Sequence, residues 1–403
     1  MALVAGLIGI EEARRRVLAA VRPLAAEPVP LAEALGRVLA VDVRSAVDVP
    51  PFDSSAMDGF AVPPGARGSL RVAGESRAGS PARRPVEPGT AVRISTGAQL
   101  PEGTGAVVAV EHAAEDGAGG VEVEAPEPGA NIRRRGEDLR AGDPVLATGD
   151  PLGPAALGVL ASVGLSEARC AARPAVAILA TGDELVELGE RLGPGQIWSS
   201  NPPALGGQVA LAGGVVERTE RVPDDAAATR RALEEAVGAA DLVCVSGGVS
   251  VGPHDHVKGA FAAIGVEESF WGVALKPGKP TWFGTAAVAG RTVLAFGLPG
   301  NPVSAMVTFQ LFVRPALRAL QGADPAASRG VAVLDEPLAR NPRRDQAVRC
   351  RLRRAGDGLH AAPTGPQGSH VLTSMLAADA LALVHAGDGA LAEGERVPVE
   401  LLD

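Results

Sequence analysis

The stretch Gly297-Leu298-Pro299-Gly300-Asn301-Pro302-Val303-Ser304 indicates how the core of this chain folds. It follows an apolar run over 292–296 that is typical of a buried strand, and it precedes an amphipathic pattern over 305–320 that is typical of a helix. Asn301 is a good N-cap, and Pro302 stands where a first helical residue tolerates a missing N–H. A strand, a glycine-rich turn and a helix N-terminus would together present free backbone N–H groups to an anion. A tight turn that only needs glycine explains the stretch equally well.

The sequence before this stretch alternates between strand-like and helix-like patterns. Strands are predicted over 175–180, 215–222 and 241–245, and a helix is predicted over 226–237. Such alternation favours a doubly wound α/β domain with a parallel sheet. In these domains ligands bind outside the carboxyl ends of the strands.

Three polar or glycine-rich loops follow the predicted strands, over 181–184, 246–252 and 297–302. Because they share one edge of one sheet, we interpret them as a ligand site, with flexible connecting turns as the alternative. The candidate ligand-binding residues are Thr181, Gly182, Asp183, Ser246, Gly247, Gly248, Ser250, Gly297, Pro299, Gly300, Asn301, Pro302 and Ser304.

Acidic side chains in the same loops could hold a metal ion. Asp183 and Glu184 are candidates for binding Mg²⁺ together with phosphate oxygens, and Asp255 is a similar candidate. The alternative for Asp183 and Glu184 is the first turn of a helix, where the helix dipole favours acids.

Two lysines lie in the proline-rich segment Lys276-Pro277-Gly278-Lys279-Pro280. Proline fixes φ and lowers the entropic cost of holding the ammonium groups in place. The segment is therefore a candidate anion site, and the alternative is a pair of solvated surface lysines.

The remaining sequence predicts further domains around the α/β domain. We expect helices over 10–22 and 155–165, a shorter helix near 31–39, and short strands over 47–150, so that a small β domain is inserted into a helical region. The expected limits are 1–46 with 151–173 for a discontinuous helical linker domain, 47–150 for the inserted β domain, 174–327 for the α/β domain, and 328–403 for a C-terminal β domain.

Composition excludes several classes of function. The net charge of −9 argues against general nucleic-acid binding, and 3% aromatic residues argue against stacking on single strands. The N-terminus lacks the features of a signal peptide, and no apolar run reaches the ~20 residues that a membrane span needs. Three scattered cysteines fit free thiols in a reducing cytoplasm.

Eight segments together resemble the molybdopterin molybdenumtransferase family, which includes MoeA and the E domain of gephyrin. They are PFDSSAMDGFAV at 51–62, STGAQLPEGTGAVV at 95–108, RRRGEDL at 133–139, TGDEL at 181–185, SGGVSVGPHD at 246–255, KPGKP at 276–280, GLPGNPVSA at 297–305 and QGSHVLTS at 367–374. They run in the family's order from about residue 50 to 375, and the whole set is highly specific.

The resemblance implies an enzyme of molybdenum cofactor biosynthesis. It would insert molybdate into adenylylated molybdopterin with Mg²⁺-dependent release of AMP, by positioning and charge neutralisation rather than by a nucleophilic cysteine. The resemblance also implies a homodimer whose site combines the α/β domain of one subunit with the inserted β domain of the other. A dedicated molybdopterin adenylyltransferase is a further candidate partner.

The family's functional residues are carried over by position in the quoted motifs. The resemblance implies catalytic roles for Asp58, Thr96, Glu184, Asp255, Lys276 and Lys279, metal ligation by Glu184 and Asp255, and substrate binding by Asp225, Arg349 and Ser369. The neighbouring Asp224 matches the same functional acid as Asp225, and the sequence leaves that choice open.

One position departs from the family's pattern. Many bacterial members carry a basic residue four positions before the first lysine of KPGKP, whereas this chain has Gly272. An arginine from elsewhere could replace the missing charge, or the chain could be a specialised paralogue. Two alternative functions therefore stay open: adenylylation of molybdopterin by the same α/β domain, and a non-catalytic binding or scaffold role.

Overall fold

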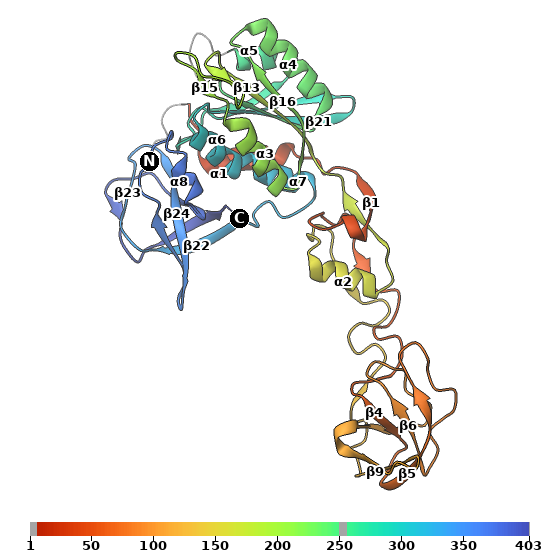
Figure 1. Ribbon diagram of the computed structural model, residues 1–403. Helices are drawn as coiled ribbons and strands as arrows, with labels where there is room; N and C mark the ends of the chain where they lie inside the picture. The colour runs from red at the N-terminus through yellow and green to blue at the C-terminus, as the bar shows by residue number, and fades with distance from the viewer. Residues whose placement is uncertain (1–5, 250–255, 403) are drawn as a thin grey trace.

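The computed structural model describes residues 6–249 and 256–402, and the molecule is elongated (Figure 1). The α/β domain and the C-terminal β domain lie together at one end, and the inserted β domain lies at the other. A slender segment that contains β1 (Ala26–Pro30) and α2 (Pro154–Ser162) joins the two ends. The expected multidomain arrangement of one α/β domain with two β-rich domains is confirmed.

The α/β domain contains a six-stranded sheet in the order β16-β13-β17-β21-β20-β18. Its strands are β13 (Ala175–Thr181), β16 (Val215–Val222), β17 (Leu242–Ser246), β18 (Glu267–Trp271), β20 (Trp282–Val288) and β21 (Arg291–Leu298). The first four strands in this order pair in parallel, as predicted, but β20 runs antiparallel to both of its neighbours. The carboxyl ends of β13, β17 and β21 therefore meet at one edge.

Helices cover both faces of this sheet, which confirms the doubly wound prediction. One face packs with α1 (Ile10–Ala20), α3 (Asn201–Leu211) and the long helix after β21 in one apolar core. The other face packs with α4 (Ala226–Ala239) and α5 (Val257–Ala263) in a second core.

The helix predicted over 305–320 is present but is not uniform. It consists of α6 (Pro302–Thr308), one π-helical segment, η3 (Phe309–Val313), and α7 (Arg314–Leu320). Pro315 has no N–H for the carbonyl oxygen of Leu311, four residues earlier, so a regular helical bond cannot form there. The guanidinium of Arg14 donates to that oxygen instead, at 3.2 Å.

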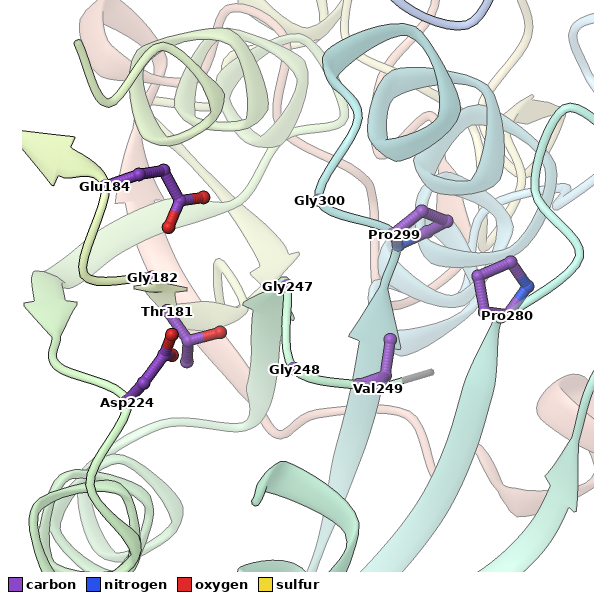
Figure 2. Close-up of a pocket in the computed structure, with 10 residues that line it drawn as sticks. All are labelled: Thr181, Gly182, Glu184, Asp224, Gly247, Gly248, Val249, Pro280, Pro299 and Gly300. Carbon is purple, nitrogen blue, oxygen red and sulfur yellow. The ribbon is translucent and has the colours of Figure 1, made fainter. Parts of the chain in front are cut away.

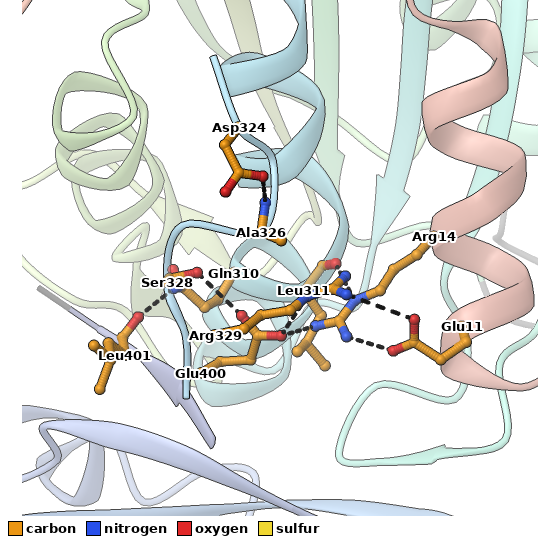
Figure 3. Close-up of polar contacts among 10 residues, drawn as sticks. All are labelled: Glu11, Arg14, Gln310, Leu311, Asp324, Ala326, Ser328, Arg329, Glu400 and Leu401. Carbon is orange, nitrogen blue, oxygen red and sulfur yellow. Dashed lines mark hydrogen bonds and ion pairs between the residues drawn. The ribbon is translucent and has the colours of Figure 1, made fainter. Parts of the chain in front are cut away.

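Arg14 also connects α1 to the C-terminal domain through a buried ion pair with Glu400 (Figure 3). Glu400 further accepts a hydrogen bond from the hydroxyl of Ser328 at 3.1 Å, and its carboxylate lies 3.4 Å from the guanidinium of Arg329. The helix α1, the helix after β21 and the C-terminal domain are thus joined by one network of polar contacts.

The linker region is built from two distant parts of the chain. Strand β1 pairs with β12 (Glu167–Ala171), and β2 (Val43–Arg44) pairs with β11 (Pro144–Leu146). The helix predicted near 31–39 is wrong, because only the 3-10 turn η1 (Leu31–Glu33) forms before Gly36 adopts a φ of +72°. The domain limits stay a prediction, and the packing of α1 argues for grouping it with the α/β domain.

The inserted domain is mostly β, as predicted, with a six-stranded sheet in the order β7-β4-β6-β5-β9-β8. Its strands are β4 (Gly59–Val62), β5 (Gly68–Ser76), β6 (Thr90–Ile94), β7 (Ala106–Ala109), β8 (Ala113–Glu115) and β9 (Gly120–Val123). In the same part of the chain, β3 (Ser54–Ser55) and β10 (Ile132–Arg133) form a separate two-stranded antiparallel ladder.

The C-terminal domain has a third six-stranded sheet, in the order β19-β24-β25-β22-β28-β26. Its strands are β19 (Leu275–Lys276), β22 (Arg329–Leu334), β24 (Asp345–Ala355), β25 (Gly358–Pro363), β26 (Ala380–Val384) and β28 (Arg396–Leu401), and α8 (Thr373–Leu376) is a short helix. Strand β19 comes from the α/β part of the sequence, so the first lysine of KPGKP lies at the edge of the C-terminal sheet.

Within the described residues, no helix has both the length and the apolar character needed to cross a membrane. All three cysteines are free and buried, as predicted. Burial raises the pKa of Cys244 and raises that of Cys350 to about 11, so neither is suited to act as a thiolate nucleophile.

Candidate active site

The loops after β13, β17 and β21 enclose a cavity of 290 Å³ at the shared strand edge. Figure 2 shows Glu184 and Asp224 on one side of this space and Pro280 and Pro299 on the other. Its lining residues are Thr181, Gly182, Glu184, Asp224, Gly247, Gly248, Val249, Pro280, Pro299 and Gly300. The prediction that the three loops come together is therefore confirmed in space.

Glycine is required in the turn after β17. Gly247 and Gly248 have φ values of +95° and +64°, a region that other residues rarely occupy. A Cβ atom on Gly247 would lie 2.7 Å from the carbonyl oxygen of Thr181. The backbones at the ends of β13 and β17 are therefore in close contact beside the cavity, and a side chain at position 247 would not fit between them.

The hydroxyl of Thr181 is a buried polar group beside this turn. The residue is 8% exposed, and its Oγ1 has no hydrogen-bond partner in the part of the chain that the structure describes. An unpaired buried hydroxyl costs free energy, and a ligand in the cavity would supply the missing partner.

The acidic residues divide into two groups. Glu184 and Asp224 line the cavity, and the Oδ1 of Asp183 accepts a hydrogen bond from the backbone N–H of Asp224 at 3.1 Å. Asp225 instead caps α4, because its carboxylate accepts from the N–H of Ala228 at 2.7 Å. Asp224, rather than the carried-over Asp225, is thus the acid that faces the cavity.

Asn201, at the start of α3, fixes the loops against one another and was not predicted from the sequence. Its side-chain NH₂ donates to the hydroxyl of Ser246 at 2.6 Å and to the carbonyl oxygen of Gly300 at 2.7 Å. Asn301 stands at the N-cap position of α6, as predicted, but its side chain does not cap the helix. It donates to the hydroxyl of Ser369 in the C-terminal domain, at 3.1 Å.

A second cavity, of 510 Å³, adjoins the first, since Pro280 lines both. Its lining residues are Lys276, Pro277, Gly278, Lys279, Pro280, Ser304, Arg344, Gln367, Gly368, Ser369 and His370. The structure thus brings Lys276, Lys279, Ser304 and Ser369 together as the sequence-based interpretation implies. Arg344 and His370 also line this cavity and were not predicted from the sequence.

Arg349 lies fully buried behind the second cavity. Its guanidinium donates to the Ser374 hydroxyl at 2.9 Å and to the carbonyl oxygen of Gly368 at 3.2 Å. Burial lowers the pKa of Arg349, and its Nη1 has no partner among the described residues. This cation therefore orders the loop that carries Ser369 and adds positive charge beneath the cavity.

Asp58 and Thr96 form a pair of their own in the inserted domain. The Oδ1 of Asp58 accepts from the backbone N–H of Thr96 at 2.7 Å and from its hydroxyl at 3.1 Å. Figure 1 places this domain at the far end of the molecule from the two cavities. One chain by itself therefore does not bring Asp58 together with Glu184.

The other predicted residues have structural roles or lie outside the described part of the chain. Gly297 belongs to β21, where a Cβ atom would lie 2.4 Å from the Cγ1 of Val249, and Pro302 is the first residue of α6. Ser250 and Asp255 lie outside the described residues. Within 6–249 and 256–402, no group of three or more His, Cys, Asp or Glu side chains is arranged to hold a metal ion.

Comparison with known proteins covers nearly the whole chain. Residues 8–164 match the family model "MoeA N-terminal region (domain I and II)", residues 177–319 match "Probable molybdopterin binding domain", and residues 331–402 match "MoeA C-terminal region (domain IV)".

Individual relatives match over almost their full length. The molybdopterin molybdenumtransferase of Haemophilus influenzae is 37% identical over 98% of both chains, and molybdopterin molybdenumtransferase 2 of Mycobacterium tuberculosis is 39% identical over 92% of this chain and 94% of its own. A crystal structure of the molybdopterin biosynthesis MoeA protein from Pyrococcus horikoshii superposes with a TM-score of 0.82 at 30% identity, over 98% of this chain and all of that one. The chain therefore belongs to the MoeA family of molybdopterin molybdenumtransferases.

Proposed function

We propose that this protein inserts molybdate into adenylylated molybdopterin and releases AMP, as a step of molybdenum cofactor biosynthesis. The observation that carries the proposal is the pair of adjoining cavities that share Pro280. One is rich in glycine turns and carboxylates, and the other is lined by cations. Two neighbouring sites of opposite character suit a reaction that joins a nucleotide-activated pterin with a separate oxyanion.

The first cavity suits the phosphate-bearing part of the pterin substrate. The Gly247–Gly248 turn has two successive positive φ values. The N–H of Gly247 donates to the carbonyl oxygen of Leu298 at 3.0 Å, so the N–H of Gly248 is the donor of this glycine pair that we propose for the anion. The unpartnered hydroxyl of Thr181 offers one more hydrogen bond. Together these groups would orient the phosphoanhydride for cleavage, which releases AMP.

The carboxylates of Glu184 and Asp224 fit Mg²⁺. This ion binds proteins through one or two carboxylates and fills its other positions with water and substrate phosphate oxygens, so a larger ligand cluster is not needed. When bound, Mg²⁺ would neutralise charge on the phosphoanhydride oxygens. We propose that Glu184 and Asp224 hold it, together with Asp255.

The second cavity suits molybdate, a tetrahedral dianion and the second substrate. Lys276 and Lys279 supply mobile positive charge, and the hydroxyls of Ser304 and Ser369 are placed to donate hydrogen bonds. The buried Arg349 adds a fixed charge behind them. Electrostatic attraction would hold the oxyanion beside the pterin without a covalent intermediate.

We further propose that the active enzyme is a homodimer in the reducing cytoplasm. Asp58 and Thr96 are held together on the exposed surface of the inserted domain, far from both cavities of the same chain. A second copy of the chain would bring its Asp58 and Thr96 to the cavities. A molybdopterin adenylyltransferase is the proposed supplier of the activated substrate.

The test is to incubate the protein with adenylylated molybdopterin, Mg²⁺ and micromolar molybdate, and to measure AMP and the molybdenum retained on the pterin. Molybdate-dependent AMP release supports the proposal. Pyrophosphate release from ATP and molybdopterin would support the adenylyltransferase alternative. Full biological activity in Asp58→Ala and Glu184→Ala variants would support a scaffold.

A further inference from the structure

We infer that Asn201 is a positioning residue of the first cavity, because its side chain fixes the peptide groups that present the N–H groups of Gly300 and Asn301 to a phosphate. The inference rests on the proposed function, since it names the residue that prepares this cavity for the phosphate-bearing part of the pterin substrate. Asn201 is not among the residues that line the cavity, so it would act through the loop after β21.

The hydrogen bonds of the Asn201 amide converge on the backbone of this loop. Its NH₂ group donates to the hydroxyl of Ser246 at 2.6 Å and to the carbonyl oxygen of Gly300 at 2.7 Å. The Ser246 hydroxyl in turn donates to the carbonyl oxygen of Pro299 at 3.4 Å, and Ser246 is only 2% exposed. Two successive carbonyl oxygens therefore point toward the buried side of the loop.

The direction of these carbonyl groups sets the direction of the N–H groups that follow them. Both peptide bonds are trans, and in a trans peptide the C=O and N–H groups point in opposite directions. The N–H groups of Gly300 and Asn301 therefore point away from Ser246 and Asn201, and neither has a hydrogen-bond acceptor among the described residues. Because Gly300 lines the cavity, two successive free donors are available to an anion there.

The glycine in this loop makes the orientation easy to lose. Since Gly300 has no Cβ atom, the peptide groups on either side of it rotate with less steric hindrance than those of other residues. A rotated peptide between Gly300 and Asn301 would turn its carbonyl oxygen toward the anion in place of the N–H and would repel it. The hydrogen bond from Asn201 opposes that rotation.

Asn201 also belongs to the segment that supports the acidic side of the cavity. Strand β15 (Ile197–Trp198) pairs in parallel with β14 (Leu185–Val186), and the N–H of Ile197 donates to the carbonyl oxygen of Glu184 at 2.8 Å. Asn201 begins α3 shortly after this ladder. One short segment thus holds both the carboxylate that we propose for Mg²⁺ and the loop whose N–H groups we propose for phosphate.

The test compares Asn201→Ala with Gln208→Ala in the full-length protein. Gln208 lies on the same helix and its amide also donates to a backbone carbonyl oxygen, that of Met306 at 3.2 Å, but neither residue lines either cavity. Asn201→Ala should lower kcat/KM for AMP release about tenfold to a hundredfold, and should weaken binding of inorganic pyrophosphate with Mg²⁺, measured by isothermal titration, about fivefold or more. Gln208→Ala should change both by less than about twofold, because the bond that it removes lies outside the cavities. Thermal denaturation checks that both variants are folded at the assay temperature.

Asn201→Asp tests the donor itself, because the nearly isosteric carboxylate places an acceptor against the carbonyl oxygen of Gly300. It should lower both quantities at least as much as Asn201→Ala, and it decides alone should Asn201→Ala fail to fold. Wild-type values in Asn201→Asp, or equal losses in Asn201→Ala and Gln208→Ala, would refute the role of Asn201 and leave the proposed function standing.

The wild-type protein separates the inference from the proposed function. If it binds pyrophosphate but releases no AMP, the proposed function is overturned, and the pyrophosphate affinities of the variants still decide the role of Asn201. If it releases AMP but binds no free pyrophosphate, the kinetics of AMP release decide that role. If it does neither, both are overturned.

Discussion

Glu400 and Arg14 form an ion pair in which each side chain is only 3% exposed, although 386 positions separate them in sequence. Through it, the last strand of the C-terminal domain is tied to α1, which packs on the α/β domain. The pair thus stabilises the contact between the two domains that line the second cavity.

Glu400→Gln should lower the free energy of unfolding by about 3 kcal/mol, because it removes the buried one of the two carboxylates that pair with the Arg14 guanidinium. Urea denaturation followed by tryptophan fluorescence measures this change. Glu11→Gln is the control, since Glu11 also pairs with Arg14 but is 68% exposed and should contribute less than about 1 kcal/mol. Equal effects of the two variants would show that burial does not strengthen the pair.

Mixing two inactive variants should restore activity if subunits share the site. Asp58→Ala and Glu184→Ala chains are each expected to be inactive, whereas refolding an equimolar mixture should give about a quarter of the wild-type rate of AMP release. Half of the dimers would then be mixed, and each mixed dimer would have one intact site of two. Two active single variants, or an inactive mixture, would contradict a site built from both subunits.

Replacing Gly272 should destabilise the protein more than replacing a glycine with free space around it. Gly290 has a similar φ of +81°, and a Cβ atom on it would meet no atom within 4 Å, so Gly290→Ala should cost only the backbone strain of about 1 kcal/mol. Gly272→Ala should cost about 2–4 kcal/mol, because the clash with Leu7 adds to that strain. Thermal denaturation of both variants compares them directly, and equal shifts would mean that Leu7 moves aside freely.

The stability of the C-terminal domain should depend on the protonation of His360. Hydrogen bonds with Asp357 and Asp335 raise the pKa of His360, and the hydrogen bonds that these carboxylates accept lower theirs. The histidine contribution is therefore complete below its unfolded pKa of about 6.5 and is lost as the pH rises through the higher folded value.

The carboxylate contribution has the opposite sign, since it is present above an unfolded pKa of about 3.9 and is lost as the pH falls through the lower folded values. Stability from this cluster should be greatest between these limits. His360→Gln should remove the decline above pH 6.5 in urea denaturation curves measured as a function of pH. A decline of unchanged size in the variant would assign it to other groups.

The sequence was sufficient for the centre of the fold, because its patterns there are long and regular. The strand over 292–296, the glycine-rich turn and the helix that follows each formed within a few residues of the predicted positions. The antiparallel strand β20 was not predicted, since its partner β18 and its place in the sheet depend on contacts that no local pattern encodes. The π-helical segment was not predicted either, because the contact between Arg14 and the carbonyl oxygen of Leu311 joins residues that lie far apart in the sequence.

The grouping of the strand-end loops around one cavity was predicted where motifs are local, and other cavity residues were missed where distant segments meet. Thr181, Gly247 and Pro299 lie around one cavity, as their positions after parallel strands imply. Asn201 and Arg344 have no motif that marks them, and only the folded chain brings them to the loops. The choice between Asp224 and Asp225 was open in the sequence, although an acid three residues before the N–H of Ala228 is a helix-capping pattern.

The strand β19 has a consequence for how this protein can be divided. Lys276 lies in β19, which pairs with β24 in the sheet of the C-terminal domain. A chimaera that exchanged the C-terminal domain at residue 328 would therefore keep β19 from one parent and take the strand that pairs with it from the other. The module that we propose to bind the oxyanion therefore consists of two separate stretches of the gene. Recombination between relatives would preserve that module only when residues 275–280 and the C-terminal domain descend from the same parent.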